Sequence, residues 1–194
     1  MIEDSHIPFR QVRLRCRCGR EMVHSSRLKT FRPTVHSSTF PMSPEEIATW
    51  ATCLAEPVRT VFNLNASGWD EDTVSTITRG GTKKHVISDV CSGEARVRAA
   101  EEHGVAVHHM PVEDGTATLS WLEEVVALAK EALARGAVLF HCYAGVGRSA
   151  LCAAALCIEA YDASARDFPR HLSRLPDAQK AVLREFEGRR LAVD

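Results

Sequence analysis

An apolar strand, a glycine-containing loop and an apolar helix follow one another in the C-terminal third of the chain. The apolar run GAVLF (136–140) leads into HCYAGVGRS (141–149), and SALCAAALCIEA (149–160) then reads as a helix with few polar positions. A continuous apolar strand is typical of a sheet that is covered on both faces. Cys152 and Cys157 on the apolar helix are therefore expected in the core.

Strands and helices alternate through the middle of the chain. The sequence predicts strands at 58–65, 84–90 and 105–112, and a helix at 93–104 that ends at a glycine. A second helix is predicted from Ser120, because Ser120 and Glu123 have the spacing of a capping box; it runs to Arg135. This alternation indicates an α/β fold with a central, mostly parallel sheet that is flanked by helices on both faces.

The segments outside this alternation give weaker patterns. Residues 10–24 alternate loosely and predict an N-terminal strand or hairpin that turns at Gly19, followed by an irregular Ser- and Pro-containing stretch to about residue 43. A helix is predicted from SPEE, with Ser43 as its N-cap. The tail from 163 to 190 predicts two further helices.

Length and charge restrict the class of protein. A chain of 194 residues with 45% hydrophobic and 25% charged residues is typical of one globular domain. We assign 46–194 to that domain and 1–45 to a basic N-terminal segment that packs on it or leads into it; the first 32 residues carry eight Arg or Lys and three acids. A net charge of −1 argues against a nucleic-acid-binding protein.

No run in the sequence approaches the length of a membrane helix, and the N-terminus lacks the apolar core of a signal peptide. We therefore expect a cytoplasmic protein without a membrane span. Seven scattered cysteines suit reduced thiols better than a disulfide framework. Cys16 and Cys18 could form half of a zinc site, but no second pair completes it, so we expect no metal.

The loop between the apolar strand and the apolar helix predicts an anion site. In a parallel sheet, ligands bind beyond the carboxyl ends of the strands, where the next helix presents its N-terminus. Gly145 and Gly147 allow a close approach that a Cβ would prevent. Arg148 offers a planar fork for two phosphate oxygens. The residues expected to bind a phosphate are His141, Tyr143, Ala144, Gly145, Val146, Gly147 and Arg148.

Cys142 is the candidate nucleophile of this loop. A thiol beside a cation and a helix N-terminus ionises more readily, and the thiolate can attack phosphorus in line. The loop and Arg148 would stabilise charge on the equatorial oxygens. Ser149 is expected to donate a hydrogen bond to the sulfur and help it leave in a second step.

The nonapeptide HCYAGVGRS matches the HCxxGxxRS signature of cysteine-dependent protein tyrosine phosphatases, and its AGxGRS form resembles their dual-specificity branch. The resemblance covers about residues 58–188 in the order of elements, and the first 45 residues lie outside it. It implies a dual-specificity-phosphatase-like fold and hydrolysis of phosphate monoesters through a phosphocysteine, with no cofactor.

The resemblance also implies an acidic residue on the loop after the preceding strand. MPVEDG places Asp114 there as the donor that protonates the leaving oxygen and later activates water, with Glu113 as the neighbouring alternative. An ordinary turn residue in an Asp-Gly pair is the other interpretation of Asp114. The resemblance further suggests that the ring of His141 orders the loop and favours the thiolate. Cys91 ends the strand predicted at 84–90, where some relatives carry a second cysteine that pairs with the oxidised nucleophile; a small core residue is the equal alternative.

These observations predict a protein phosphatase that acts on phosphotyrosine and also on phosphoserine or phosphothreonine, with a phosphorylated protein as partner. Lipid and inositol phosphatases share the loop chemistry and remain an alternative, although they often place lysines where this loop has Tyr143, Ala144 and Val146. Two further alternatives are a rhodanese-like sulfurtransferase and a pseudophosphatase that only binds phosphate. The sequence leaves the physiological substrate, the oligomeric state and the role of the basic segment open.

Overall fold

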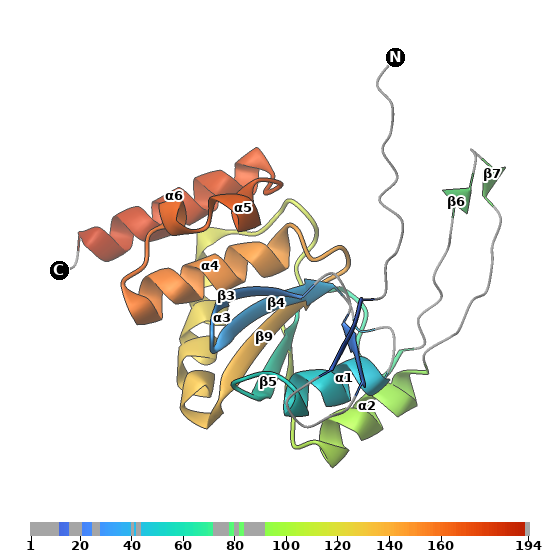
Figure 1. Ribbon diagram of the computed structural model, residues 1–194. Helices are drawn as coiled ribbons and strands as arrows, with labels where there is room; N and C mark the ends of the chain where they lie inside the picture. Colours follow the sequence, from blue (N-terminus) through green and yellow to red (C-terminus); the bar gives the residue numbers. More distant parts are fainter. Residues whose placement is uncertain are drawn as a thin grey trace.

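The computed structural model describes residues 12–15, 21–24, 28–39, 41, 44–71, 78–79, 82–83 and 92–192. Its centre is a five-stranded sheet in which four strands run parallel and one edge strand, β3, is antiparallel (Figure 1). The predicted α/β class with a mostly parallel sheet is confirmed. In spatial order the strands are β3 (Lys29–Arg32), β4 (Val35–Thr39), β9 (Ala137–Cys142), β5 (Val58–Asn63) and β8 (Ala106–His109).

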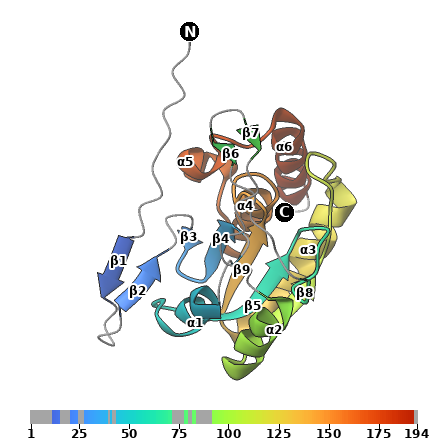
Figure 2. The same cartoon turned by 90° about the vertical axis from the view of Figure 1, so that its right-hand side faces the viewer.

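Helices cover both faces of this sheet, as Figures 1 and 2 show. Along β9 the side chains alternate between the faces: Leu139 joins the core under one pair of helices, and Phe140 joins the core under the other group. Both faces of the sheet are therefore covered along β9, which explains why β9 is buried at every position. The first face carries α1 (Pro44–Thr52) and α2 (Gly93–Glu102), and the second carries α3 (Leu119–Ala132), α4 (Arg148–Tyr161) and α6 (Asp177–Leu191).

Helix α4 is apolar because it is enclosed. Every residue from Arg148 to Ile158 is buried, with β9 on one side and α3 and α6 on the other. Apolar residues on all sides of a helix are expected in such a position. None of the helices in the described residues has the combination of length and apolar character that crossing a membrane requires.

The shorter elements lie around this framework. The predicted hairpin near residues 10–24 is confirmed, since β1 and β2 pair antiparallel. Gly19, Ser43, Cys91 and the strand predicted at 84–90 lie outside the described residues. The remaining elements are β1 (Val12–Arg15), β2 (Glu21–His24), β6 (Thr78–Arg79), β7 (Thr82–Lys83), η1 (Leu133–Arg135), η2 (Ala165–Asp167) and α5 (Pro169–Leu172).

The stretch before residue 43 was predicted to be irregular, and that prediction is wrong. It contains the hairpin β3–β4, and β4 lies inside the sheet beside β9. The sequence of β4 is VHSST, whose polar side chains conceal the strand, yet all five residues are buried. Residues 29–39, which precede the boundary predicted at residue 45, therefore belong to the same sheet as the strands that follow it.

The start of α3 also differs from the prediction. Its N-cap is Thr118, whose hydroxyl accepts a hydrogen bond from the backbone N–H of Trp121, and Ser120 is already inside the helix. Both residues have cap-forming side chains, and the spacing of Ser120 and Glu123 imitates a capping box. The chain enters the helix from an extended Thr118, which makes Thr118 the residue at the boundary.

Gly93 generates a first prediction, for stability. A Cβ at this position would collide with the backbone carbonyl of Asp70, in the loop that follows β5. We expect Gly93→Ala to destabilise the fold by about 1–3 kcal/mol, the usual cost of overpacking. On α6, a Cβ at Gly188 meets nothing, so Gly188→Ala should be neutral or slightly stabilising. Urea denaturation measures the free energy of unfolding of both variants. Equal values for Gly93→Ala and Gly188→Ala would contradict the close packing of α2 on this loop.

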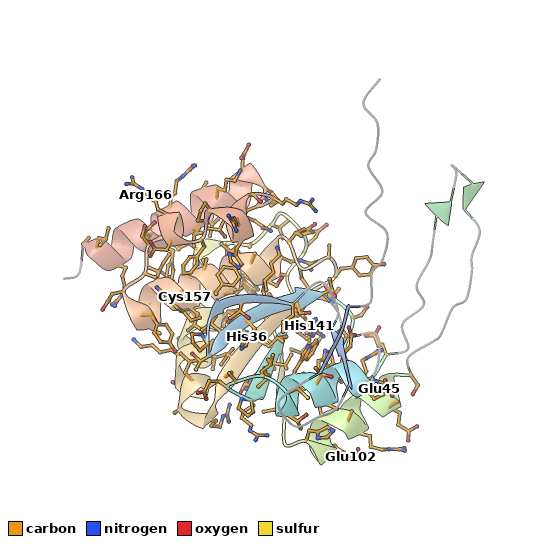
Figure 3. The ribbon with its side chains drawn as sticks, viewed as in Figure 1. His36, Glu45, Glu102, His141, Cys157 and Arg166 are labelled. Carbon is orange, nitrogen blue, oxygen red and sulfur yellow. The ribbon has the colours of Figure 1, made fainter. Side chains whose placement is uncertain are left out.

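Two buried histidines generate a second prediction, for pH dependence. His36 on β4 and His141 on β9 lie inside the sheet (Figure 3). Burial lowers the pKa of His36 to about 4. Burial, and then the charges of Arg96, His109 and Arg148, lower the pKa of His141 to about 3.

Both histidines are neutral in the folded protein and take up a proton on unfolding below pH about 6.5, the ordinary histidine pKa. The unfolded state then binds more protons, so stability falls as pH drops, by about 1.4 kcal/mol per pH unit for each histidine. The free energy of unfolding, measured between pH 7 and pH 5 for the wild type and His36→Gln, should fall less steeply in the variant. Equal slopes would contradict a neutral, buried His36.

Candidate active site

Cys142 is the last residue of β9, and its side chain is 3% exposed. Two groups of the following loop and helix contact its sulfur: the backbone N–H of Gly145 donates a hydrogen bond over 3.3 Å, and Ser149 Oγ lies 3.3 Å away. The backbone N–H and the hydroxyl are both groups that can donate a hydrogen bond to sulfur. The predicted nucleophile and the predicted hydrogen-bonding serine are therefore in contact.

The loop needs its two glycines for different reasons. Gly145 has φ +68°, and a Cβ there would lie 2.9 Å from backbone atoms of Ser38 and Thr39 at the end of β4. The strand that the sequence concealed thus forms the wall against which the loop packs. At Gly147 a Cβ would lie 3.2 Å from Gln179 Oε1 and 3.5 Å from Asp114 Oδ1, so only a glycine leaves this space open.

Arg148 begins α4 and is fixed by backbone carbonyls. Its Nη1 donates to the carbonyl oxygens of Leu64, 3.0 Å away, and Val112, 2.8 Å away, which follow the ends of β5 and β8. Its Nε lies 3.6 Å from Asp114 Oδ1 and donates no hydrogen bond within the described residues. The guanidinium is thus held in place with a donor edge still available to an anion.

Asp114 lies opposite this arginine on the loop after β8. The loop turns at Gly115, where φ is +82°, and Thr116 N–H donates to the Glu113 carbonyl oxygen. The Asp114 side chain is 73% exposed and lines the same pocket as Cys142, whereas Glu113 does not line it. Of the two carboxylates in the motif, the structure brings Asp114 to the sulfur and Arg148.

His141 lies beneath the loop and does not reach the pocket. Its Nε2 accepts a hydrogen bond from the indole N–H of Trp69 over 2.6 Å, and the two rings stack at 5.6 Å between centroids. Because an accepting Nε2 cannot carry a proton, the ring is neutral with its proton on Nδ1, in agreement with its lowered pKa. The fully buried Arg96 of α2 donates to the carbonyl oxygens of Trp69 and Glu71. These hydrogen bonds fix the loop after β5, which contains both residues.

Several residues around the site carry little signal in the sequence. Trp69 lies in an irregular loop, and Gln179 lies on α6 far from the signature motif. Gln179 is 1% exposed, yet neither atom of its amide has a hydrogen-bond partner in the described part of the chain. The pocket measures about 130 Å³ and is lined by Asp114, Cys142, Tyr143, Ala144, Val146, Gly147, Arg148, Arg174 and Pro176.

Cys152 and Cys157 differ from Cys142 in their surroundings. Burial raises the pKa of the Cys152 thiol well above its usual range and that of Cys157 to about 12. Both side chains are packed in α4 and neither contacts the pocket. They are core residues, as expected from the apolar helix.

The arrangement suits a tetrahedral anion. A sulfur lies at the base of the pocket, the donor edge of an arginine lies at its side, and α4 begins there without a side-chain cap on its N-terminus. The positive end of a helix dipole favours an anion at that position. Within the described residues no three His, Cys, Asp or Glu side chains come together as a metal site.

Comparison with known proteins agrees with this geometry. The family model described as cyclin-dependent kinase inhibitor 3 (CDKN3) matches residues 59–167, more than half of the chain. No curated protein sequence matches.

Several solved structures share the fold. Tk-PTP in its active form is 23% identical with a TM-score of 0.59 and covers 84% of this chain and 98% of its own. PTPMT1 is 21% identical with a TM-score of 0.61 and covers 85% of this chain and 96% of its own. A single-residue variant of human DUSP28 is 19% identical with a TM-score of 0.57 and covers 87% and 99%. With the family match, these likenesses show that the chain belongs to the CDKN3 family, within the superfamily of cysteine-dependent protein tyrosine and dual-specificity phosphatases.

Proposed function

We propose that this protein is a protein phosphatase that hydrolyses phosphotyrosine, and also phosphoserine and phosphothreonine, through a phosphocysteine at Cys142. Its relation to cysteine-based phosphatases supports the broader class of phosphoric monoester hydrolase. The observation that carries the proposal is the shared pocket: the sulfur of Cys142, the guanidinium of Arg148 and the carboxylate of Asp114 all face it.

In the first step, the Cys142 thiolate attacks phosphorus, a sulfur–phosphorus bond forms, and the bond from phosphorus to the leaving oxygen breaks. Protonated Asp114 gives its proton to that oxygen. The free donor edge of Arg148 and the N-terminus of α4 stabilise charge on the equatorial oxygens, which is greatest in the transition state.

In the second step, water attacks phosphorus and the sulfur leaves as a thiolate. The Asp114 carboxylate takes a proton from the water, and the hydroxyl of Ser149 and the N–H of Gly145 stabilise the departing sulfur. We assign the orientation of this water to the Gln179 amide, which is buried, has no partner among the described residues and faces Gly147 beside Asp114. A buried amide without a partner is costly unless a ligand or water satisfies it.

The composition of the loop supports a protein substrate. Its variable positions are Tyr143, Ala144 and Val146, none of which adds a cation for a multiply phosphorylated headgroup. A phosphoinositide is the second candidate, because a structural neighbour, PTPMT1, has been crystallised in complex with PI(5)P. We place the reaction in the cytoplasm, where the thiols of Cys53, Cys142, Cys152 and Cys157, free in this structure, would stay reduced.

Turnover of p-nitrophenyl phosphate with a metal chelator present tests the reaction class. The wild type should be active and Cys142→Ser inactive, and phosphopeptides should be better substrates than phosphoinositide vesicles. Binding of phosphopeptides without turnover would favour a pseudophosphatase, and transfer of sulfur from thiosulfate would favour a rhodanese-like enzyme. Better turnover of the vesicles would replace the protein substrate with the lipid.

Asp114 generates a third prediction, which depends on the leaving group. Asp114→Asn should lower kcat/KM on phenyl phosphate, which reports the first step, by about 10²–10⁴, the usual contribution of a general acid. On p-nitrophenyl phosphate the loss in kcat/KM should be smaller, because nitrophenolate leaves without a proton. Glu113→Gln is the matched control, and its kcat should stay within about twofold of the wild type, since Glu113 is outside the pocket. The opposite pattern would make Glu113 the acid.

Trp69 generates a fourth prediction, for its effect through His141. Trp69→Phe keeps an aromatic ring but removes the donor to His141 Nε2. Loss of one hydrogen bond that orders the loop should lower kcat by about tenfold with little change in KM. Trp50→Phe is the control, because Trp50 is also buried but lies in α1 and is not the tryptophan that donates to His141 Nε2. Steady-state kinetics and thermal unfolding are measured for both variants. An equal loss of kcat in the two variants would contradict this role of Trp69.

A further inference from the structure

Two further cations lie around the pocket, in addition to Arg148. Arg174, in the turn between α5 and α6, lines the pocket and is exposed. Lys29 is the first residue of β3 and pairs with Ser37 of β4, close to Thr39, which pairs with Cys142, so Lys29 lies at the same edge of the sheet as the sulfur. Burial and then the charge of Arg174 lower the pKa of Lys29, and the charge of Cys142 opposes that shift. Three segments distant in sequence thus bring two positive charges close to the reacting sulfur.

Among the described residues these two cations have no carboxylate partner. In the described part of the chain neither Lys29 nor Arg174 takes part in an ion pair or a hydrogen bond from its side chain, whereas Arg148 has Asp114 as its partner and Lys180 has Asp177. Two cations that repel each other without a carboxylate between them are poorly arranged for stability. They are well arranged for an anionic group of a ligand that already places a phosphate on the loop.

The remaining walls of the pocket favour a peptide over a membrane lipid. Tyr143 is 66% exposed at the pocket, with Pro176 beside it, and these suit the ring of a phosphotyrosine. The other large exposed apolar residues of the described chain, Val107, Tyr161 and Leu191, do not line the pocket. Apart from Tyr143, the described residues thus place no large exposed apolar side chain at the pocket with which to enter a bilayer.

We propose that Lys29 and Arg174 form a second anion subsite that binds an acidic side chain, carboxylate or phosphorylated, next to the phosphotyrosine of a peptide substrate. This inference rests on the proposed function and adds a selection rule to it: phosphotyrosines in acidic sequences are the preferred substrates. The phosphate loop supplies the chemistry, and the subsite supplies the choice among substrates.

The test compares two phosphotyrosine peptides that differ only in carrying Glu or Gln at every position flanking the phosphotyrosine. The ratio of their kcat/KM values is the readout, since a loss common to both peptides cancels. The wild type should prefer the Glu peptide by about tenfold at low salt, and high salt should weaken the preference. Lys29→Gln and Arg174→Gln should each lower the ratio to about threefold or less. Arg170→Gln is the control, because Arg170 is an exposed arginine on α5 that does not line the pocket.

The outcomes separate this proposal from the one on which it rests. Equal turnover of the two peptides by the wild type would overturn the subsite and leave the protein phosphatase intact. If Arg170→Gln reduces the preference for the Glu peptide as much as Arg174→Gln does, the preference comes from general surface charge. That result would overturn the subsite as well. No turnover of either peptide, with hydrolysis of phosphoinositide vesicles that depends on Arg174, would overturn both proposals and give the subsite to a lipid headgroup.

Discussion

The hydrogen bond from the Gly145 N–H to the Cys142 sulfur is the contact on which the rest of the site depends. It requires φ +68° at Gly145 and a close approach of this glycine to the backbone of Ser38 and Thr39. Those residues end β4, which pairs in parallel with β9 up to Cys142 itself. The depth of the sulfur is therefore fixed by two adjacent strands and by the first part of α4, which is buried from Arg148 to Ile158.

The charges around the sulfur are arranged to suit one more anion. His141 is buried, neutral and held by the indole of Trp69, so it adds no full positive charge beside the sulfur. Arg148 is anchored by two carbonyl oxygens, and its Nε, which faces Asp114, makes no hydrogen bond among the described residues. A guanidinium fixed before the substrate arrives loses little side-chain entropy when the phosphate binds. The backbone carbonyls of Leu64 and Val112 hold the Arg148 guanidinium in this position in advance.

Much of the fold, and the grouping of Cys142, Arg148 and Asp114 at one pocket, could be predicted, because the strand, the loop and the apolar helix are consecutive in sequence. Cys142 ends a strand that the sequence indicates, and Arg148 and Asp114 follow such strands. Strand β4 could not be predicted from the sequence, because its mostly polar residues show no apolar alternation and are buried only by neighbouring elements. Trp69, Gln179 and Arg174 reach the site from segments that only tertiary packing brings together, so no local pattern could indicate them. Cys91 lies outside the described residues, and its redox role stays a prediction.

The measurement that tests the central claim most directly is detection of the phosphocysteine. Asp114→Asn can still release nitrophenolate, which needs no proton, but its second step is slow because no carboxylate activates water. Acid quenching of this variant during turnover of p-nitrophenyl phosphate, followed by peptide mass spectrometry, should find one phosphoryl group on Cys142. Turnover with Cys142 unmodified, or with the phosphoryl group on another residue, would contradict the mechanism.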